Sequence, residues 1–124
     1  MKKIKMLKGE CWWGGKAPDG CCMPYDENSA VTVDIRGRSS ENDQSASMFL
    51  SSCGRYIWND NPFTAEFKNG EIILKDERES PFDIQEGFKT LKGAYMAAMK
   101  KHFPFTGCLP HKLFFTSPQY NTWM

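Results

Sequence analysis

The residues best suited to ligand chemistry lie close together near the N-terminus. Trp12, Trp13 and Asp19 fall within residues 10–25, a window that is also rich in Gly and Pro. An indole ring offers a flat apolar face to the C–H face of a sugar, and a carboxylate accepts hydrogen bonds from hydroxyl groups. Because Gly and Pro interrupt regular elements, the window predicts a structured loop, and functional residues are concentrated on loops. Core packing of the indoles and a plain Asp-Gly turn are the alternative interpretations.

The cysteines do not form a pattern typical of a metal site. They stand at positions 11, 21, 22, 53 and 108, and the two histidines at positions 102 and 111 have no second pair nearby. Structural zinc requires spaced Cys/His pairs, whereas two adjacent cysteines are poor chelators of that kind. The odd number and the lack of an export signal favour reduced thiols that pack as small buried hydrophobic side chains. We therefore expect no metal and no cofactor.

Composition limits the class of protein. The chain of 124 residues suits one domain. Its net charge of +1 gives no broad positive electrostatic potential that would attract nucleic acid or an acidic membrane. The N-terminal residues carry lysines without an apolar run behind them, so they do not resemble a signal peptide. No stretch is long enough to span a bilayer. We expect a cytoplasmic protein that binds neither nucleic acid nor membrane.

The elements that must position these residues are mainly strands. Apolar and polar residues alternate through residues 63–68, and Asn69-Gly70 is a strong hairpin signal. Residues 36–47 are polar and predict a solvent-exposed loop. Arg55 is expected to pair with a carboxylate under the sandwich; a solvated side chain is the alternative. Further strands are predicted at residues 2–8 (an edge strand), 30–35, 48–50, 55–58, 71–75, 112–116 and 119–124.

One helix is predicted, over residues 90–102. Thr90 can cap its N-terminus, basic residues occupy its last turn, and Pro104 ends it. Three- and four-residue spacing places one apolar stripe on it, which predicts that its members face the core: Leu91, Ala94, Tyr95, Ala98 and Met99.

Four blocks in this order resemble the N-terminal β-sandwich of glycoside hydrolase family 31 proteins. The central block is residues 50–63, with the sequence LSSCGRYIWNDNPF. The early block, residues 12–25, resembles that family's first loop, and residues 90–104 resemble its domain-closing helix. Residues 118–123, PQYNTW, are similar to the entry into the first strand of the family's (β/α)₈ barrel.

The resemblance implies a reduced, galactose-mutarotase-like antiparallel β-sandwich over residues 1–117, with residues 118–124 beginning a barrel strand. It also implies a parent enzyme that is a retaining α-glycosidase, which uses two carboxylates about 5–5.5 Å apart. Both are expected on late barrel strands, so no residue of this chain is assigned a catalytic role and the chain alone is expected to be inactive.

The resemblance implies that the sandwich packs on the catalytic barrel and lends residues 12–25 to the substrate side, with Trp12, Trp13 and Asp19 as the sugar-binding candidates. The alternative is a stand-alone module that binds carbohydrate or associates with itself. A bare barrel-facing surface would be an apolar patch, and such patches bind partners. We therefore expect the isolated chain to form a homo-oligomer, with residues 119–124 or the neighbouring face at the contact.

Overall fold

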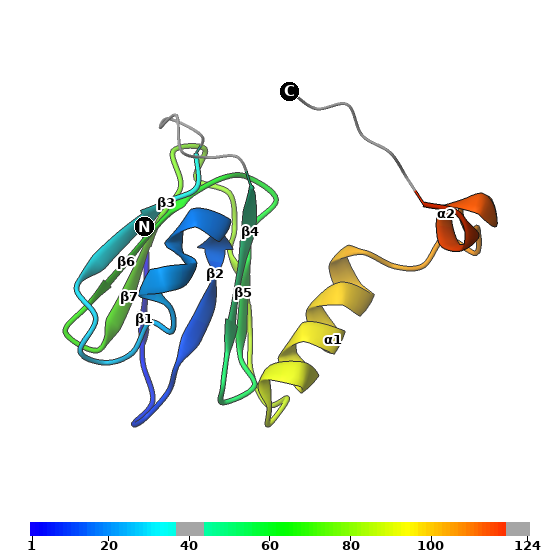
Figure 1. Cartoon of the computed structure of the whole chain (residues 1–124). Helices are drawn as coiled ribbons and strands as arrows, with labels where there is room; N and C mark the ends of the chain where they lie inside the picture. Colours follow the sequence, from blue (N-terminus) through cyan, green and yellow to red (C-terminus); the bar gives the residue numbers. More distant parts are fainter. Residues whose placement is uncertain (37–43, 119–124) are drawn as a thin grey trace.

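Two antiparallel sheets of four strands each form a β-sandwich, which confirms the predicted fold class (Figure 1). The structure is a computed structural model that describes residues 1–36 and 44–118. The first sheet has the order β1 (Lys2–Lys5), β7 (Glu71–Lys75), β6 (Thr64–Lys68) and β3 (Val31–Asp34). The second has the order β2 (Trp12–Lys16), β4 (Ser45–Ser51), β5 (Tyr56–Trp58) and β8 (Asp83–Gln85).

The hairpin between β6 and β7 forms where Asn69-Gly70 predicts it. Lys68 pairs with Glu71 at its end, and Asn69 and Gly70 have φ values of 54° and 70°. Two consecutive positive φ values define the tight turn whose twist matches that of antiparallel strands, and Asn and Gly tolerate them best. The edge strand predicted within residues 2–8 is confirmed over Lys2–Lys5, because β1 pairs with β7 alone among the described strands and forms the edge of its sheet.

The main core lies between the two sheets and is rich in aromatic rings. Tyr25 stacks on Phe67 with ring centroids 4.5 Å apart, and Phe49 meets the edge of Phe67 at 5.5 Å. Burying one such side chain stabilises the fold by about 1.5–3 kcal/mol, so these rings dominate the stability of the sandwich. The fully buried residues of this core include Trp12, Tyr25, Phe49, Ile57, Phe63, Ala65, Phe67, Ile72 and Leu74.

The prediction of an irregular loop over residues 10–25 is wrong. The segment contains β2 and a 3₁₀ helix, η1 (Ala17–Cys22). The glycines that predicted a break instead permit a β-bulge, because the pairing with β4 shifts between Gly14 and Gly15. Gly14 has a φ of 138°, and a Cβ there would lie 2.2 Å from the Met48 carbonyl oxygen. Only glycine allows β2 to approach β4 so closely.

The helix α1 (Leu91–His102) covers the outer face of the second sheet, and its existence and cap are as predicted. The Thr90 side chain accepts a hydrogen bond of 3.1 Å from the Gly93 N–H. Ala94 and Ala98 are fully buried against Tyr56, with Met48, Leu50, Trp58, Phe88 and Ala97 around them. This second, smaller core fixes the helix to β4 and β5.

The prediction that the whole apolar stripe of α1 faces the core is only half right. Leu91 and Tyr95 are exposed and Met99 is half-buried, whereas Ala94 and Ala98 are buried. The small alanine side chains let the helix backbone lie close to the sheet, and this places the larger side chains at the rim. The sequence spacing of apolar residues shows that they share one side of the helix, but it does not show which of them contact the sheet and which lie at its rim.

The chain beyond α1 leaves the sandwich, and Figure 1 shows α2 (Leu113–Thr116) to the side of α1, away from both sheets. The predicted strand over residues 112–116 is therefore wrong: the backbone there is helical. An apolar run as short as Leu113-Phe114-Phe115 has no period that separates a strand from a helical turn. The prediction of a loop over residues 36–47 is wrong at its end, since β4 begins at Ser45. Residues 37–43 of this predicted loop lie outside the described residues. The predicted strand at residues 119–124 lies outside them as well.

The cysteines do not behave as small buried hydrophobic residues, so that prediction is also wrong. Cys21, Cys22 and Cys108 are exposed, and Cys11 and Cys53 are half-buried. All five have free thiols.

Candidate functional site

The two tryptophans of β2 point to opposite faces of the second sheet. Trp12 has no exposed surface and packs in the core, with the Arg55 guanidinium 5.2 Å from its ring centroid. Trp13 stands opposite Leu50 and is half-buried. Adjacent strand residues alternate between faces, so one indole is structural and the other has surface available to a ligand.

Trp13 lines a shallow apolar groove of about 250 Å³ on the outer face of the sheet. Its lining includes Met23, Met48 and Leu50. Asp19, on η1, does not line this groove; it is partly exposed, and its carboxylate lies 4.0 Å from the Lys16 amino group. The structure therefore places the three predicted sugar-binding residues in three different environments rather than on one surface.

A second groove, which the sequence did not predict, lies between α1 and strands β4 and β5. It has a volume of about 450 Å³ and a largely apolar lining with a few polar groups. The lining residues are Ser45, Ala46, Ser47, Met48, Trp58, Asn59, Asp60, Tyr95, Met99 and Phe103. Apolar walls with a few convergent polar groups are typical of small-molecule sites. The sequence signal was the run Trp58-Asn59-Asp60, but the helix side of the groove comes from residues almost forty positions later.

Aromatic contacts fix the position of Trp58 in this groove. Its ring stacks on His102 at 4.5 Å and meets the edge of Phe103 at 5.2 Å. Its indole N–H donates a hydrogen bond of 2.8 Å to an Asp60 carboxylate oxygen. Asp60 and exposed Tyr95 also line the groove, and they place a carboxylate and a hydroxyl group beside its aromatic wall.

Asp83 anchors the end of α1 and so holds the groove in shape. One of its carboxylate oxygens accepts hydrogen bonds from the Tyr56 hydroxyl at 2.9 Å, Lys101 at 2.7 Å and His102 at 2.9 Å. Burial by itself raises the pKa of Asp83, but the hydrogen bonds from Lys101, Gln85, Tyr56 and His102 outweigh it and hold the pKa well below its usual value.

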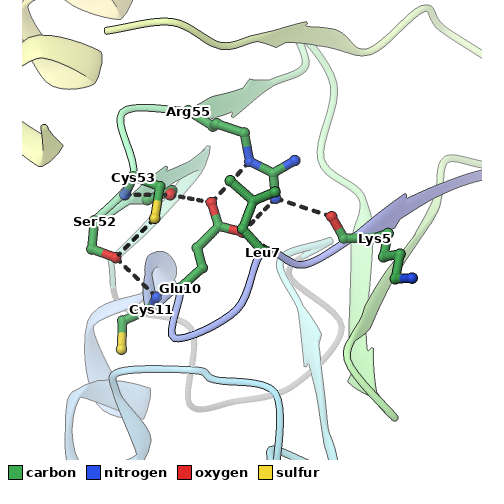
Figure 2. Close-up of polar contacts among 8 residues, drawn as sticks. Lys5, Leu7, Glu10, Cys11, Ser52, Cys53 and Arg55 are labelled. Carbon is green, nitrogen blue, oxygen red and sulfur yellow. Dashed lines mark hydrogen bonds and ion pairs between the residues drawn. The ribbon is translucent and has the colours of Figure 1, made fainter. Parts of the chain in front are cut away.

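A buried carboxylate, Glu10, lies between β1 and β2 and bonds to Ser51 at the end of β4 and to Arg55 just before β5 (Figure 2). The Arg55 Nε donates to it at 2.8 Å, the second Arg55 nitrogen and the Ser51 hydroxyl donate as well, and the Leu7 N–H adds a bond of 3.0 Å. Arg55 also donates to the Lys5 carbonyl at 3.1 Å. The predicted pairing of Arg55 with a carboxylate is confirmed, and this network serves the fold.

The electrostatics of Glu10 agree with that structural role. Burial favours the neutral acid and by itself raises the pKa, whereas the hydrogen bonds from Arg55, Leu7 and Ser51 favour the carboxylate and lower it below the usual value. An ionised Glu10 that is bonded on both oxygens has little capacity left for a ligand.

Within residues 1–36 and 44–118, no three Cys, His, Asp or Glu side chains come together as a possible metal site. In the same part of the chain, no helix combines the length and apolar character needed to cross a bilayer. No protein-family model matches this sequence, and no curated protein matches it.

Proposed function

We propose that this chain is the non-catalytic β-sandwich of a cytoplasmic retaining α-glycosidase that resembles glycoside hydrolase family 31. Its role is to pack on a (β/α)₈ barrel that holds the two catalytic carboxylates and to lend residues near β2 and η1 to the substrate side. The observation that carries the proposal is a two-sheet sandwich followed by a segment whose large apolar side chains are left exposed by the rest of the described residues.

The uncovered segment, residues 103–116, follows α1 directly. Its six large apolar side chains are 58–75% exposed: Phe103, Phe105, Leu109, Leu113, Phe114 and Phe115. Contiguous exposed apolar surface marks interaction sites, and burying one such side chain fully is worth about 1.5–3 kcal/mol. Docking on a partner domain would bury these side chains, and the barrel is the partner that the resemblance supplies.

The substrate-side role falls to Trp13 and Asp19, which both keep exposed surface. Trp13 offers part of an indole face for stacking on a sugar ring, and Asp19 offers carboxylate oxygens to sugar hydroxyls. Trp12 supports this region from the core, since its own ring has no exposed surface.

The test is co-expression of the chain with the barrel that the source genome encodes in frame with it or beside it. Size-exclusion chromatography with light scattering is expected to give a one-to-one complex. The double variant Phe114→Ser/Phe115→Ser is expected to lose the complex. Met96→Ser, which removes an equally exposed apolar side chain from α1, is expected to keep it. A complex that survives the double variant would refute docking through this segment.

The second candidate function is a stand-alone carbohydrate-binding module, and the groove between α1 and the second sheet favours it. Trp58 and Tyr95 would face the apolar side of a sugar while Asp60 accepts hydrogen bonds from its hydroxyls. Titration of the isotope-labelled chain with maltose, isomaltose and xylose-bearing sugars tests this by NMR. Shifts confined to the groove that Asp60→Asn reduces would support it, and no shifts at millimolar sugar would refute it.

Self-association is the related alternative. In the absence of a barrel, residues 103–116 of two copies can cover each other, so the isolated chain is expected to form a homo-oligomer. Light scattering at increasing protein concentration measures this. The double variant Phe114→Ser/Phe115→Ser is expected to remain monomeric, and a wild-type monomer at high concentration would count against the proposal.

A further inference from the structure

Two adjacent thiols stand side by side on η1. The Sγ atoms of Cys21 and Cys22 lie 3.8 Å apart, and both side chains are exposed. Successive side chains on an extended strand point to opposite faces, whereas the 3₁₀ turn of η1 brings this pair to one side. The chain therefore presents a vicinal dithiol to solvent.

The turn that carries the thiols is tied to the sandwich at its start and closed at its end. The Ala17 N–H donates to the Gln44 carbonyl at 3.0 Å, and the Met23 N–H donates to the Gly20 carbonyl at 3.3 Å. The Cys21 Sγ lies 4.0 Å from the Pro18 carbonyl oxygen. Because the turn keeps the two thiols close together, an atom bound by one sulfur meets the second sulfur at a high effective concentration. Both sulfurs can therefore bind the same atom.

A disulfide between the two cysteines is geometrically unfavourable. A relaxed disulfide has an S–S bond of about 2.03–2.05 Å and Cα atoms about 4.4–6.8 Å apart. Adjacent residues joined by a trans peptide have Cα atoms only about 3.8 Å apart. A bridge through one inserted atom keeps the sulfurs apart and avoids this strain.

The atom that fits must need only two sulfur ligands from the protein. Zinc requires four protein ligands in a structural site, and the described residues bring no third metal-binding side chain to this pair. Thiolates prefer soft centres. Trivalent arsenic that carries one organic group needs two further ligands, which is the number this turn supplies.

We propose that Cys21 and Cys22 form a dithiol site that captures organic trivalent arsenicals as a cyclic dithioarsenite. With phenylarsine oxide, two As–S bonds form, the As–O bond breaks, and the oxygen leaves as water with the two thiol protons. Arsenic stays trivalent, so no oxidant or reductant is needed. The pKa of the Cys22 thiol is raised, chiefly by its hydrogen bond with Cys21.

The test is mass spectrometry of the intact full chain after treatment with one equivalent of phenylarsine oxide, followed by excess glutathione. Wild type is expected to keep one adduct, with the mass of the reagent less one water, until a small dithiol such as dithiothreitol removes it. Cys21→Ser and Cys22→Ser are each expected to lose the adduct to glutathione. Both positions are exposed, so these changes leave the core intact.

Two controls distinguish this pair from the other thiols. Cys108→Ser removes an exposed cysteine elsewhere, and Cys11→Ser/Cys53→Ser removes the two half-buried cysteines. Both variants are expected to keep the glutathione-resistant adduct. An adduct that survives in Cys21→Ser or Cys22→Ser, or one that glutathione removes from wild type, would overturn the proposal.

Discussion

The Glu10 carboxylate and the Arg55 guanidinium, 45 residues apart in the sequence, form a buried ion pair with the Arg55 Nε 2.8 Å from Glu10 Oε1. The pair joins the segment before β2 to the start of β5. It also places the Arg55 guanidinium over the ring of Trp12. Arg55 thus contacts β1 through the Lys5 carbonyl and β2 through the ring of Trp12, which belongs to the aromatic core.

Removing one member of this pair is predicted to destabilise the fold severely. Arg55→Ala leaves Glu10 buried without its main donor, and loss of one partner of a buried pair typically costs about 3–5 kcal/mol. Urea denaturation measures the change. As the control, Lys75→Ala breaks the exposed pair with Glu66, where the nitrogen–oxygen distance is 3.3 Å, and is expected to cost no more than about 1 kcal/mol. Equal effects of the two variants would contradict a structural role for Glu10–Arg55.

Stability is predicted to fall in acid because Glu10 and Asp83 both have lowered pKa values in the folded chain. In the unfolded chain their pKa values return to about 4.3 and 3.9, so the unfolded state binds more protons as pH falls. Their contribution is complete above about pH 5 and is lost as pH falls through the folded values.

The measurement is the free energy of unfolding between pH 7 and pH 3 for wild type and Asp83→Asn. The variant keeps the shape of the side chain but has no carboxyl group to titrate. It is expected to be less stable at pH 7 and to show a shallower loss in acid. A slope equal to that of wild type would show that Asp83 does not contribute.

Two buried tyrosines form a matched pair with opposite predictions. The Tyr25 hydroxyl is buried with no hydrogen-bond partner among the described residues, whereas the Tyr56 hydroxyl donates to Asp83 at 2.9 Å. A buried unsatisfied polar group costs about 1–3 kcal/mol, and a made hydrogen bond contributes about 1 kcal/mol. Tyr25→Phe is therefore expected to be neutral or stabilising, and Tyr56→Phe destabilising, in urea denaturation. The reverse order would contradict the two assignments.

The alanines of α1 are predicted to be intolerant of larger side chains. Ala98 is fully buried where the helix lies against the sheet, so Ala98→Leu forces the helix outward and is expected to cost about 1–3 kcal/mol. Met96→Leu, at an exposed position of the same helix, is expected to change stability by less than about 0.5 kcal/mol. Urea denaturation followed by tryptophan fluorescence reports on the contact through Trp58. Equal stability of both variants would refute close packing at Ala98.

Local signals predicted the parts of the fold that depend on neighbouring residues. Alternation and Asn69-Gly70 are sufficient for the β6–β7 hairpin, and Thr90 with the spacing that follows is sufficient for α1. The existence of β2 was not predictable in the same way, because Gly14 and Gly15 are breakers in isolation and become necessary only when β4 lies against them. The buried face of α1 likewise depends on the sheet it meets.

In the candidate sites, too, the features that depend on residues far apart in the sequence could not be predicted. An acidic partner for Arg55 was predictable because a buried guanidinium needs one, but its identity as Glu10 depends on how the chain folds back. The groove between α1 and β5 combines Asp60 with Tyr95 and could not be read from either segment alone. The closeness of the thiols of Cys21 and Cys22 depends on the 3₁₀ turn, which the sequence window did not predict.

We propose that this sandwich serves a glycosidase barrel, and the coding sequence that adjoins codon 124 in the source genome tests this proposal. We expect a (β/α)₈ barrel, in frame or in the neighbouring gene, with two acidic residues on late strands. We also expect the sandwich and barrel together to hydrolyse aryl α-glycosides with retention of configuration. A neighbourhood that encodes no such barrel would contradict the claim and leave the groove at α1 as the function to test.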